Sequence, residues 1–285
     1  MATHRIGVLL NRNRCAYSYA LADALDAVAA DQEIELEYWP VGWASSTDLV
    51  DSTEFEETLG RAADVSGLVM FSAVFSHGLK TLAKFTQAWW PRPAASIGYR
   101  LPLVPSVVVD NRSAMHAATR HLIQEHGRRD IVFIRGRADS QEATDRYFGF
   151  RQALNEGHLI LDASRVLEGD FTRQSALVAL GKLPPTTPVD ALIASNDEMA
   201  LAAMIELERR GLRVPSDVSV IGFDDVPAAA HARSPLTTMR QPYEALAQKA
   251  IALVNEQCEG RHVPALTGVP VDFVHRVSCG CGAPR

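Results

Sequence analysis

The fold is decided by residues 190–241, which read DALIASNDEMALAAMIELERRGLRVPSDVSVIGFDDVPAAAHARSPLTTMRQ. A short apolar run at 191–195 predicts a buried strand, and 197–210 predicts a helix that ends at Gly211. Residues 218–223 then predict a second buried strand. Two buried strands joined by a helix are typical of a parallel sheet with helices on its faces.

The same alternation extends in both directions from this segment. Further strands are predicted at 6–11, 34–38, 67–73, 94–98, 106–110, 130–135, 165–167 and 269–274. Further helices are predicted at 17–30, 55–65, 79–89, 113–126, 142–156, 173–180 and 243–259. The pattern forms two successive series that meet near Gly136, so we expect an α/β protein with two doubly wound parallel sheets.

The composition is that of a soluble globular protein with two domains. The chain has 285 residues, of which 47% are hydrophobic and 22% charged, enough apolar surface for two cores. It carries 28 Lys and Arg against 34 Asp and Glu, and a formal charge of −6 disfavours a chain that binds phosphodiesters by itself. No apolar stretch approaches the roughly 18–20 residues of a membrane helix, and the start does not match a secretory signal. We therefore expect a cytoplasmic protein without membrane contact.

The four cysteines do not form a disulfide framework in a chain of this length. Cys15 and Cys258 are isolated and are interpreted as ordinary thiols. Cys279 and Cys281 are separated by one residue, a spacing that leaves a metal or redox role open. No third and fourth ligand with zinc-like spacing accompanies this pair, so we expect no metal and no cofactor.

Catalytic motifs are missing from the sequence. It contains no Gly-x-Ser-x-Gly elbow, no Walker loop, no Gly-x-Gly-x-x-Gly after a strand and no His-Glu-x-x-His. The histidines His116, His121 and His126 follow at five-residue spacing, which places them on different parts of a helix surface, so they are interpreted as ordinary surface residues. Asp224 and Asp225 are adjacent on a strand and point opposite ways, so they make a poor acid–base pair. We expect that the chain is not an enzyme.

Polar residues follow several of the predicted strands. In open parallel sheets ligands bind at the carboxyl ends of the strands, which makes these positions candidates for a binding site. The same residue types favour helix N-caps, so both interpretations stay open for each of them. The residues are Asn11, Ser72, Asp110, Asn196 and Asp224.

The segment 190–241 resembles the lactose/galactose-repressor (LacI/GalR) family. It combines Asn-Asp-x-Met-Ala at the start of a helix, Arg-Gly-x-x-Val-Pro at its end, the strand Val-Ile-Gly-Phe-Asp-Asp and a following Leu-Thr-Thr. Further matches lie at 107–111, 121–123, 126–129, 133–136, 146–150 and 169–171. The resemblance covers nearly the whole chain and is weakest over 40–105. It implies the effector-binding domain of such a regulator, with a periplasmic-binding-protein-like type I fold.

This resemblance also implies a domain organisation. We place one lobe at 1–136 plus 242–266 and the other at 137–241 plus 267–285. The three hinge crossings are then expected near Gly136, 238–241 and 265–268. Family members begin with a helix-turn-helix, whereas this chain begins at the first strand of the sensor, so DNA contact is expected only through a domain absent from this chain. The ending 277–281 resembles a subgroup whose sensors are joined to other signalling outputs.

The resemblance assigns ligand-binding roles to individual residues. Arg146 is expected to donate hydrogen bonds to ligand oxygens, because guanidinium offers a fixed fork of donors. Phe171 is expected to stack on a ligand ring, Asp224 to accept from ligand hydroxyls, and Asn196 to donate and accept. The alternatives are a surface salt bridge for Arg146, core packing for Phe171 and a helix cap for Asn196. The other lobe contributes candidates at strand ends or in the first loop, namely Asn11, Tyr17, Ser72 and Asp110.

The expected function is ligand sensing by clamp closure. A sugar, polyol or nucleoside binds between the lobes and stabilises the closed state, which moves an attached output or a dimer partner. Arg146 and Asp224 are expected to project from the edge of their lobe, so that their removal leaves stability almost unchanged. A homodimer is expected, and the apolar stripe Leu79, Leu82, Phe85 and Trp89 is one candidate for the interface, with packing inside the lobe as the alternative for part of it. A solute-binding receptor for transport and an enzyme are the alternatives.

Overall fold

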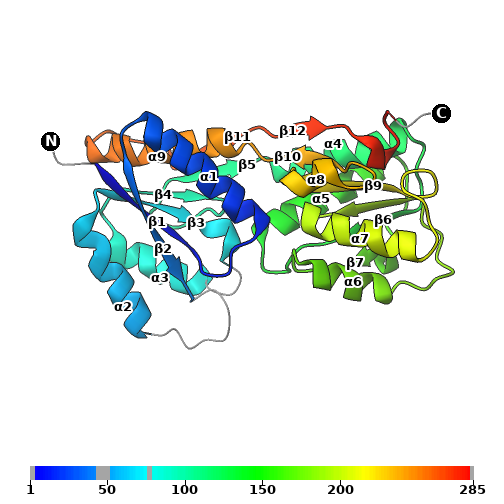
Figure 1. The fold of residues 1–285 in the computed structure, drawn as a ribbon, viewed down its shortest axis with the longest axis horizontal. Coiled ribbons are helices and arrows are strands. Elements are labelled where there is room, and N and C mark those ends of the chain that lie inside the picture. Colours follow the sequence, from blue (N-terminus) through cyan, green and yellow to red (C-terminus); the bar gives the residue numbers. More distant parts are fainter. Residues whose placement is uncertain (1–3, 43–51, 76–78, 283–285) are drawn as a thin grey trace. The chain divides into compact units, whose positions relative to one another are not determined.

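Two discontinuous units make up the protein in a computed structural model, which describes residues 4–42, 52–75 and 79–282 (Figure 1). Each unit has one six-stranded sheet and helices that are interleaved with the strands in sequence. The prediction of two doubly wound α/β lobes is therefore confirmed. Unit 1 consists of Met1–Val109 and Pro242–Pro270, and unit 2 of Asp110–Gln241 and Val271–Arg285.

The sheet of unit 1 has the strand order β11-β5-β4-β3-β1-β2, and neighbouring strands pair in parallel throughout its described residues. Its strands are β1 (Arg5–Asn11), β2 (Glu35–Val41), β3 (Gly67–Phe71), β4 (Ala94–Ile97), β5 (Ser106–Val109) and β11 (Leu266–Val269). Its helices are α1 (Ala16–Asp31), α2 (Ser52–Gly60), α3 (Leu79–Trp89) and α9 (Tyr243–Cys258), with short 3-10 turns η1 (Arg61–Asp64) and η2 (Ser72–Val74).

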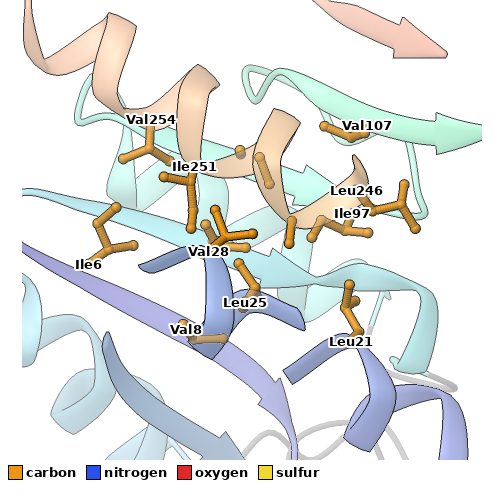
Figure 2. Packing of buried hydrophobic residues seen from close by; sticks show 14 of the residues in the cluster. Ile6, Val8, Leu21, Leu25, Val28, Ile97, Val107, Leu246, Ile251 and Val254 are labelled. Atoms are coloured by element: carbon orange, nitrogen blue, oxygen red, sulfur yellow. The ribbon is translucent and has the colours of Figure 1, made fainter. Parts of the chain in front are cut away.

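The two faces of this sheet bury separate apolar clusters. Helices α1 and α9 lie side by side on one face, where the alternating strand residues Ile6 and Val8 meet Leu25 of α1 and Ile251 of α9 (Figures 1 and 2). On the other face α3 packs its apolar side against β1 and β3. Because strand side chains alternate between faces, a continuous apolar strand such as β1 supplies both clusters.

The apolar side of α3 decides between a dimer interface and packing inside the lobe. Leu82, Phe85 and Trp89 are at most 1% exposed and belong to the core of unit 1, where Trp89 contacts Trp39 edge to face. They are therefore not available for a dimer interface. The side chain of Leu79, the remaining member of the predicted stripe, lies outside the described residues.

The sheet of unit 2 has the strand order β12-β10-β9-β8-β6-β7, and it is parallel except for the pairing of β10 with β12. Its strands are β6 (Ile131–Ile134), β7 (Val166–Leu167), β8 (Ala191–Ala194), β9 (Ser219–Asp224), β10 (Thr237–Arg240) and β12 (Asp272–Val274). Its helices are α4 (Asn111–Gln124), α5 (Gln141–Glu156), α6 (Arg173–Gly181), α7 (Asp197–Arg209) and α8 (Pro227–His231), with 3-10 turns η3 (Ala163–Arg165) and η4 (Val277–Cys279).

The boundary between the units differs from the predicted one. We expected the first crossing near Gly136, but the segment from Asp110 onward already belongs to unit 2. The reason is that α4 packs against α5 and that β6 pairs with β7 and β8 in the second sheet. The crossing therefore lies between β5 and α4. The later crossings lie at Gln241–Pro242 and Pro270–Val271.

The last crossing also explains a difference in the strands. Residues 269–274 were predicted as one strand, whereas the structure has β11 in the sheet of unit 1 and β12 in the sheet of unit 2. The chain leaves one sheet after Val269 and enters the other at Asp272. One apolar run thus supplies residues to an edge strand of each sheet. In the described part of the chain, none of the helices has both the length and the apolar character needed to cross a bilayer.

Candidate functional site

The carboxyl edge of the second sheet brings together polar residues from three neighbouring strands. Strand β9 lies between β8 and β10, and Asp224 at its end pairs in register with Arg240. Ser195 and Asn196 directly follow β8, and Gln241 directly follows β10. Parallel strands end at the same edge, so these side chains form one polar surface, as the strand-end pattern predicts.

Arg146 joins this edge from helix α5. Its Nε donates to Oδ1 of Asn111 on α4 at 2.7 Å, and its Nη1 donates to the carbonyl oxygen of Ser195 at 2.5 Å. The guanidinium carbon lies 3.6 Å from the centre of the Phe223 ring, a cation–π contact that covers one face of the group. Within the described part of the chain we find no acceptor for Nη2. The guanidinium is thus fixed by protein on one side and retains donors for another group.

Asp224 is the nearest carboxylate to this guanidinium. Its Oδ1 lies 3.9 Å from Nη1 of Arg146 and accepts from Nε2 of Gln241 at 3.2 Å. Burial raises the pKa of Asp224 to about 7, although the positive charge of Arg146 and the hydrogen bond from Gln241 act in the opposite direction. The carboxyl group is therefore held close to its ionisation point at neutral pH.

Both residues are buried, which corrects the expectation that they project freely from the edge of the lobe. Arg146 is 3% exposed and Asp224 is 5% exposed. The backbone of Asp224 has φ +118° and that of Asp225 has φ +58°, conformations that side-chain-bearing residues rarely adopt. Strain of this kind is found preferentially at functional sites, where the surrounding structure enforces it.

At the ends of β8 and β10, two buried polar atoms have no hydrogen-bond partner among the described residues. They are Oγ of Ser195 and Oε1 of Gln241. Buried polar groups are satisfied in more than nine of ten cases, and leaving one unpaired costs about 1–3 kcal/mol. Together with Nη2 of Arg146 they give the edge a hydroxyl, a carbonyl oxygen and a guanidinium donor that can bind a polar molecule.

The neighbouring carboxylate, Asp225, has a different role. It accepts from Nε of Arg240 at 2.7 Å and lies 2.6 Å from Nη1 of Arg276. Burial raises its pKa, but the hydrogen bonds and charges of the two arginines bring it below its ordinary value. Asp225 thus ties β10 to the segment after β12, and only Asp224 faces Arg146.

Phe171 and Asn196 are joined to each other. Nδ2 of Asn196 donates to the carbonyl oxygen of Phe171 at 3.0 Å, while Oδ1 of Asn196 accepts from the backbone N–H of Met199 and caps α7. Phe171 has φ +72°, and its ring lies directly over Gly136, where a Cβ atom would come within 2.2 Å of Cζ. Asn196 is therefore a helix cap, and its side chain also holds Phe171 in its strained conformation.

The candidates of unit 1 gather at the ends of β1 and β3, which are neighbouring strands. The Ser72 hydroxyl is fully buried, donates to the carbonyl oxygen of Ile97 and accepts from Ser96 and from the N–H of Tyr99. Its hydrogen-bonding capacity is used within the unit, which favours a structural role.

Asn11 is the last residue of β1, and Tyr17 lies at the start of α1. Oδ1 of Asn11 accepts from the N–H of Asn13 at 2.8 Å, and the ring of Tyr17 lies 5.7 Å from that of Tyr243. Asp110, which we assigned to the N-terminal lobe, begins unit 2 and caps α4 by accepting from the N–H of Ser113 at 2.9 Å. Asp110 is therefore a helix cap as well.

Four residues at the carboxyl edge of the second sheet were not identified from the sequence. Asn111 and Ser195 hold Arg146, Gln241 contacts Asp224, and Asp197 accepts from Thr238 Oγ1 at 2.6 Å and from the N–H of Val226 at 3.0 Å. Burial and the nearby Asp224 raise the pKa of Asp197 well above its ordinary value. Asp197 and Gln241 lie inside the segment 190–241, so the position directly after a buried strand or at a helix start could have indicated them.

Comparisons with known proteins agree with this geometry. Residues 119–279 match the model of the periplasmic binding protein-like domain family. The HTH-type transcriptional repressor PurR of Aliivibrio salmonicida is 33% identical over 196 residues, which cover 68% of this chain and 58% of the repressor. The HTH-type transcriptional regulator CelR of Thermobifida fusca is 38% identical over 158 residues, 55% of this chain and 46% of the regulator. The chain thus spans about half the length of these relatives.

A solved structure gives the same result for the fold. The complex of the transcriptional regulator CelR with cellobiose has a TM-score of 0.82 and 26% identity, and the match covers 96% of this chain and 84% of that one. The resemblance drawn from the motifs of segment 190–241 is confirmed. The chain belongs to the periplasmic binding protein-like domain family, and its relatives are transcriptional regulators of the LacI type.

Proposed function

We propose that this chain is the ligand-sensing part of a LacI-type transcriptional regulator. The observation that carries the proposal is the carboxyl edge of the second sheet, where the buried Arg146 and Asp224 lie 3.9 Å apart beside unpaired polar atoms of Ser195 and Gln241. A rigid, desolvated set of donors and acceptors is what a binding site for a small polar molecule requires. Asn11 and Tyr17 of unit 1 are proposed to contribute the remaining contacts.

The ligand class follows from the chemistry of the edge. Arg146 supplies donors, Asp224 supplies an acceptor, and Phe171 of the same unit supplies an aromatic surface. A molecule with several hydroxyl groups on a ring satisfies such a set, because each hydroxyl both donates and accepts. The neighbour solved with cellobiose supports a sugar, and polyols and nucleosides have matching groups.

The mode of action follows from differential binding. A ligand shifts a conformational equilibrium only by as much as it favours one state over another. We propose that ligand bound by groups from both units stabilises one arrangement of them and thereby changes an attached output. Sensing rather than catalysis, and a place in the cytoplasm, are parts of this proposal that the regulators among the relatives support.

Isothermal titration of the purified chain with cellobiose and with panels of sugars, polyols and nucleosides tests the proposal. Asp224→Asn keeps the size of the side chain and removes its charge. Removal of one charged partner of a buried hydrogen bond typically costs about 2–5 kcal/mol of binding, so the affinity for the best ligand is expected to fall by roughly thirty- to several-thousand-fold.

Asp225→Asn is the matched control, because it changes the adjacent carboxylate, which is bound to Arg240 and Arg276. This variant is expected to unfold more easily and to bind the ligand as the parent does. Equal loss of affinity in both variants, or full affinity in Asp224→Asn, would contradict the proposed site. Absence of binding across all panels would contradict the proposed ligand class.

A further inference from the structure

Four side chains with metal-ligand chemistry meet at one end of unit 2. They are His121, His126, Cys279 and Cys281, and their ligand atoms all lie within 4.8 Å of one another. His121 lies on α4 and His126 follows the end of that helix, while the two cysteines come from the last described residues of the chain. Figure 1 shows α4 close to β12 in this part of the unit, and the two elements contact each other.

The separations between these atoms match a tetrahedral metal centre. Nε2 of His121 lies 3.1 Å from Nε2 of His126. Sγ of Cys281 lies 3.4 Å and 3.5 Å from the same two nitrogens, and Sγ of Cys279 lies 3.7 Å from Nε2 of His121. Zinc bonds of about 2.0–2.1 Å to nitrogen and about 2.3 Å to sulfur, set at tetrahedral angles, place two nitrogens roughly 3.3 Å apart and a nitrogen and a sulfur roughly 3.6 Å apart.

The backbone is shaped to bring the ligands together. Helix α4 ends at Gln124, and Gly127 has φ +63°, the left-handed conformation that is common after a helix end. His126 lies in this turn, and its ring contacts that of His121. Gly280, between the two cysteines, has φ +106°, and a Cβ atom there would lie 3.2 Å from the His126 ring. Glycine at this position therefore permits both the turn and the close approach of the imidazole.

The segment that carries the cysteines is anchored independently of them. Oγ of Ser278 donates to the carbonyl oxygen of Val220 and accepts from the N–H of Thr237, and the carbonyl oxygen of Cys279 accepts from Oγ of Ser219. Cys279 is fully buried, and the other three ligands are partly buried. Hydrogen bonds to strands β9 and β10 thus hold the cysteine segment in place.

We propose that His121, His126, Cys279 and Cys281 bind one zinc ion. Two thiolates and two imidazoles in tetrahedral arrangement suit zinc, whereas magnesium and calcium take oxygen ligands. All four positions are filled by protein, which is the pattern of a structural site. The ion would join α4 to the segment after β12 and so fasten the end of the described chain to unit 2.

The sequence shows no third and fourth ligand with zinc-like spacing beside Cys279 and Cys281, because the two histidines come from a distant part of the chain. The two histidines are about 150 residues away in sequence, as the separations of 155 and 160 positions between contacting pairs show. The five-residue spacing of His121 and His126 separates two residues on a continuous helix, but α4 ends at Gln124 and His126 lies beyond it. Only the fold brings the pairs together.

The test measures metal binding by the purified chain. We expect one zinc per chain by elemental analysis after expression in zinc-containing medium, and competition with a chromophoric chelator to return the same stoichiometry on reconstitution of the metal-free protein. Cobalt in place of zinc is expected to give the intense visible bands and the sulfur-to-metal charge transfer of tetrahedral thiolate coordination. A metal-free preparation that binds neither ion overturns the proposal.

Variants locate the site. Cys281→Ser and His126→Asn are expected to lose stoichiometric zinc and the cobalt bands, with circular dichroism to verify the fold. Cys258→Ser and His116→Asn are the matched controls, because Cys258 ends α9 in unit 1 and His116 pairs with Glu156 at 2.6 Å. Zinc retained at full stoichiometry in folded Cys281→Ser and His126→Asn, or lost equally in the controls, overturns the assignment. His275→Asn tests whether the neighbouring imidazole, whose Nδ1 lies 3.9 Å from Sγ of Cys281, is a ligand. This variant is expected to retain the ion.

If Cys281→Ser and His126→Asn fail to fold, thiol titration of the parent chain still tests the zinc site. Thiol titration is expected to show Cys279 and Cys281 protected in the zinc-loaded protein and reactive once a chelator is added, while the exposed Cys15 and Cys258 react in both states. Four thiols that react alike with and without chelator contradict the proposal.

Discussion

Asp224 is a buried acid whose ionisation couples stability to pH. Burial raises its pKa from 3.8 to about 7 in the folded protein. A raised folded pKa means that the contribution of this group to stability is fully present below the unfolded pKa and is lost as pH rises through the folded value. The ionised carboxylate is the form that the folded state disfavours.

Asp224→Asn is therefore expected to gain stability over the parent as pH rises from about 4 to about 7. The difference reaches at most about 4 kcal/mol, since each pKa unit corresponds to about 1.4 kcal/mol. Urea unfolding of both proteins at several pH values across this window measures it. A stability difference that does not change with pH would show that Asp224 ionises as an ordinary carboxyl group does.

Gly136 leaves room for the ring of Phe171. A Cβ atom at this position would lie 2.2–2.7 Å from three carbons of that ring. Gly136→Ala is expected to displace Phe171 and to lower the free energy of unfolding by roughly 1–3 kcal/mol, the usual cost of overpacking.

Gly181→Ala is the matched control, because a Cβ atom there meets nothing within 4 Å and the residue ends α6. That variant is expected to be neutral or slightly more stable. Chemical denaturation of both variants gives the comparison. Equal stability of Gly136→Ala and the parent would mean that the ring of Phe171 moves aside freely.

The sequence indicates the positions of polar residues at strand ends but not their roles. Asn196 and Asp110 follow strands and Asp224 ends one, yet the first two cap helices and the third faces a guanidinium. Asn and Asp serve both purposes with the same atoms, so residue type alone does not separate them. The partner of Arg146 on α4 depends on how two helices pack, which no local pattern contains.

At the level of elements, α7 depends on one side chain at its start. Asn196 caps the helix with its oxygen and holds the Phe171 carbonyl with its nitrogen. Asn196→Ala is expected to lower the free energy of unfolding by about 1–2 kcal/mol for the cap, with a further loss for the second hydrogen bond. Thermal or urea unfolding measures this.

Asn196→Asp separates the two contributions. Aspartate caps as well as asparagine but has no N–H group to donate to the Phe171 carbonyl. This variant is expected to lose less stability than Asn196→Ala and to weaken ligand binding if Phe171 contributes to it. Identical stability of the parent and Asn196→Ala would exclude both contributions.

Element types were predictable where the pattern was long. Helices such as α1, α3 and α9 repeat their apolar spacing over three or more turns, and their ends lie within about two residues of the expected ones. Strands β10, β11 and β12 have three or four residues each and were missed or merged. Strands β11 and β12 lie at the edges of their sheets, and β10 lies between β12 and β9. Their place in a sheet is decided by partners far along the chain, which no local pattern indicates.

For the whole molecule we expect a homodimer, as the family resemblance implies. The core position of α3 removes one candidate interface, so the contact must use other surfaces. Sedimentation at tens of micromolar is expected to give about twice the mass of one chain. A single species of one-chain mass at that concentration would contradict the expectation.

The division of each unit into separate stretches of sequence has a consequence for synthesis on the ribosome. Unit 1 begins at the N-terminus, but its core needs Ile251 and Val254 of α9, and its edge strand β5 pairs with β11. The residues Asp110–Gln241 of unit 2 are all made before these arrive. Domains usually fold as they emerge, the first one first. Here residues 1–109 keep part of their apolar surface exposed until α9 and β11 have been made. By then most of unit 2 is already available to fold. The unit whose synthesis starts first therefore completes its core late in translation.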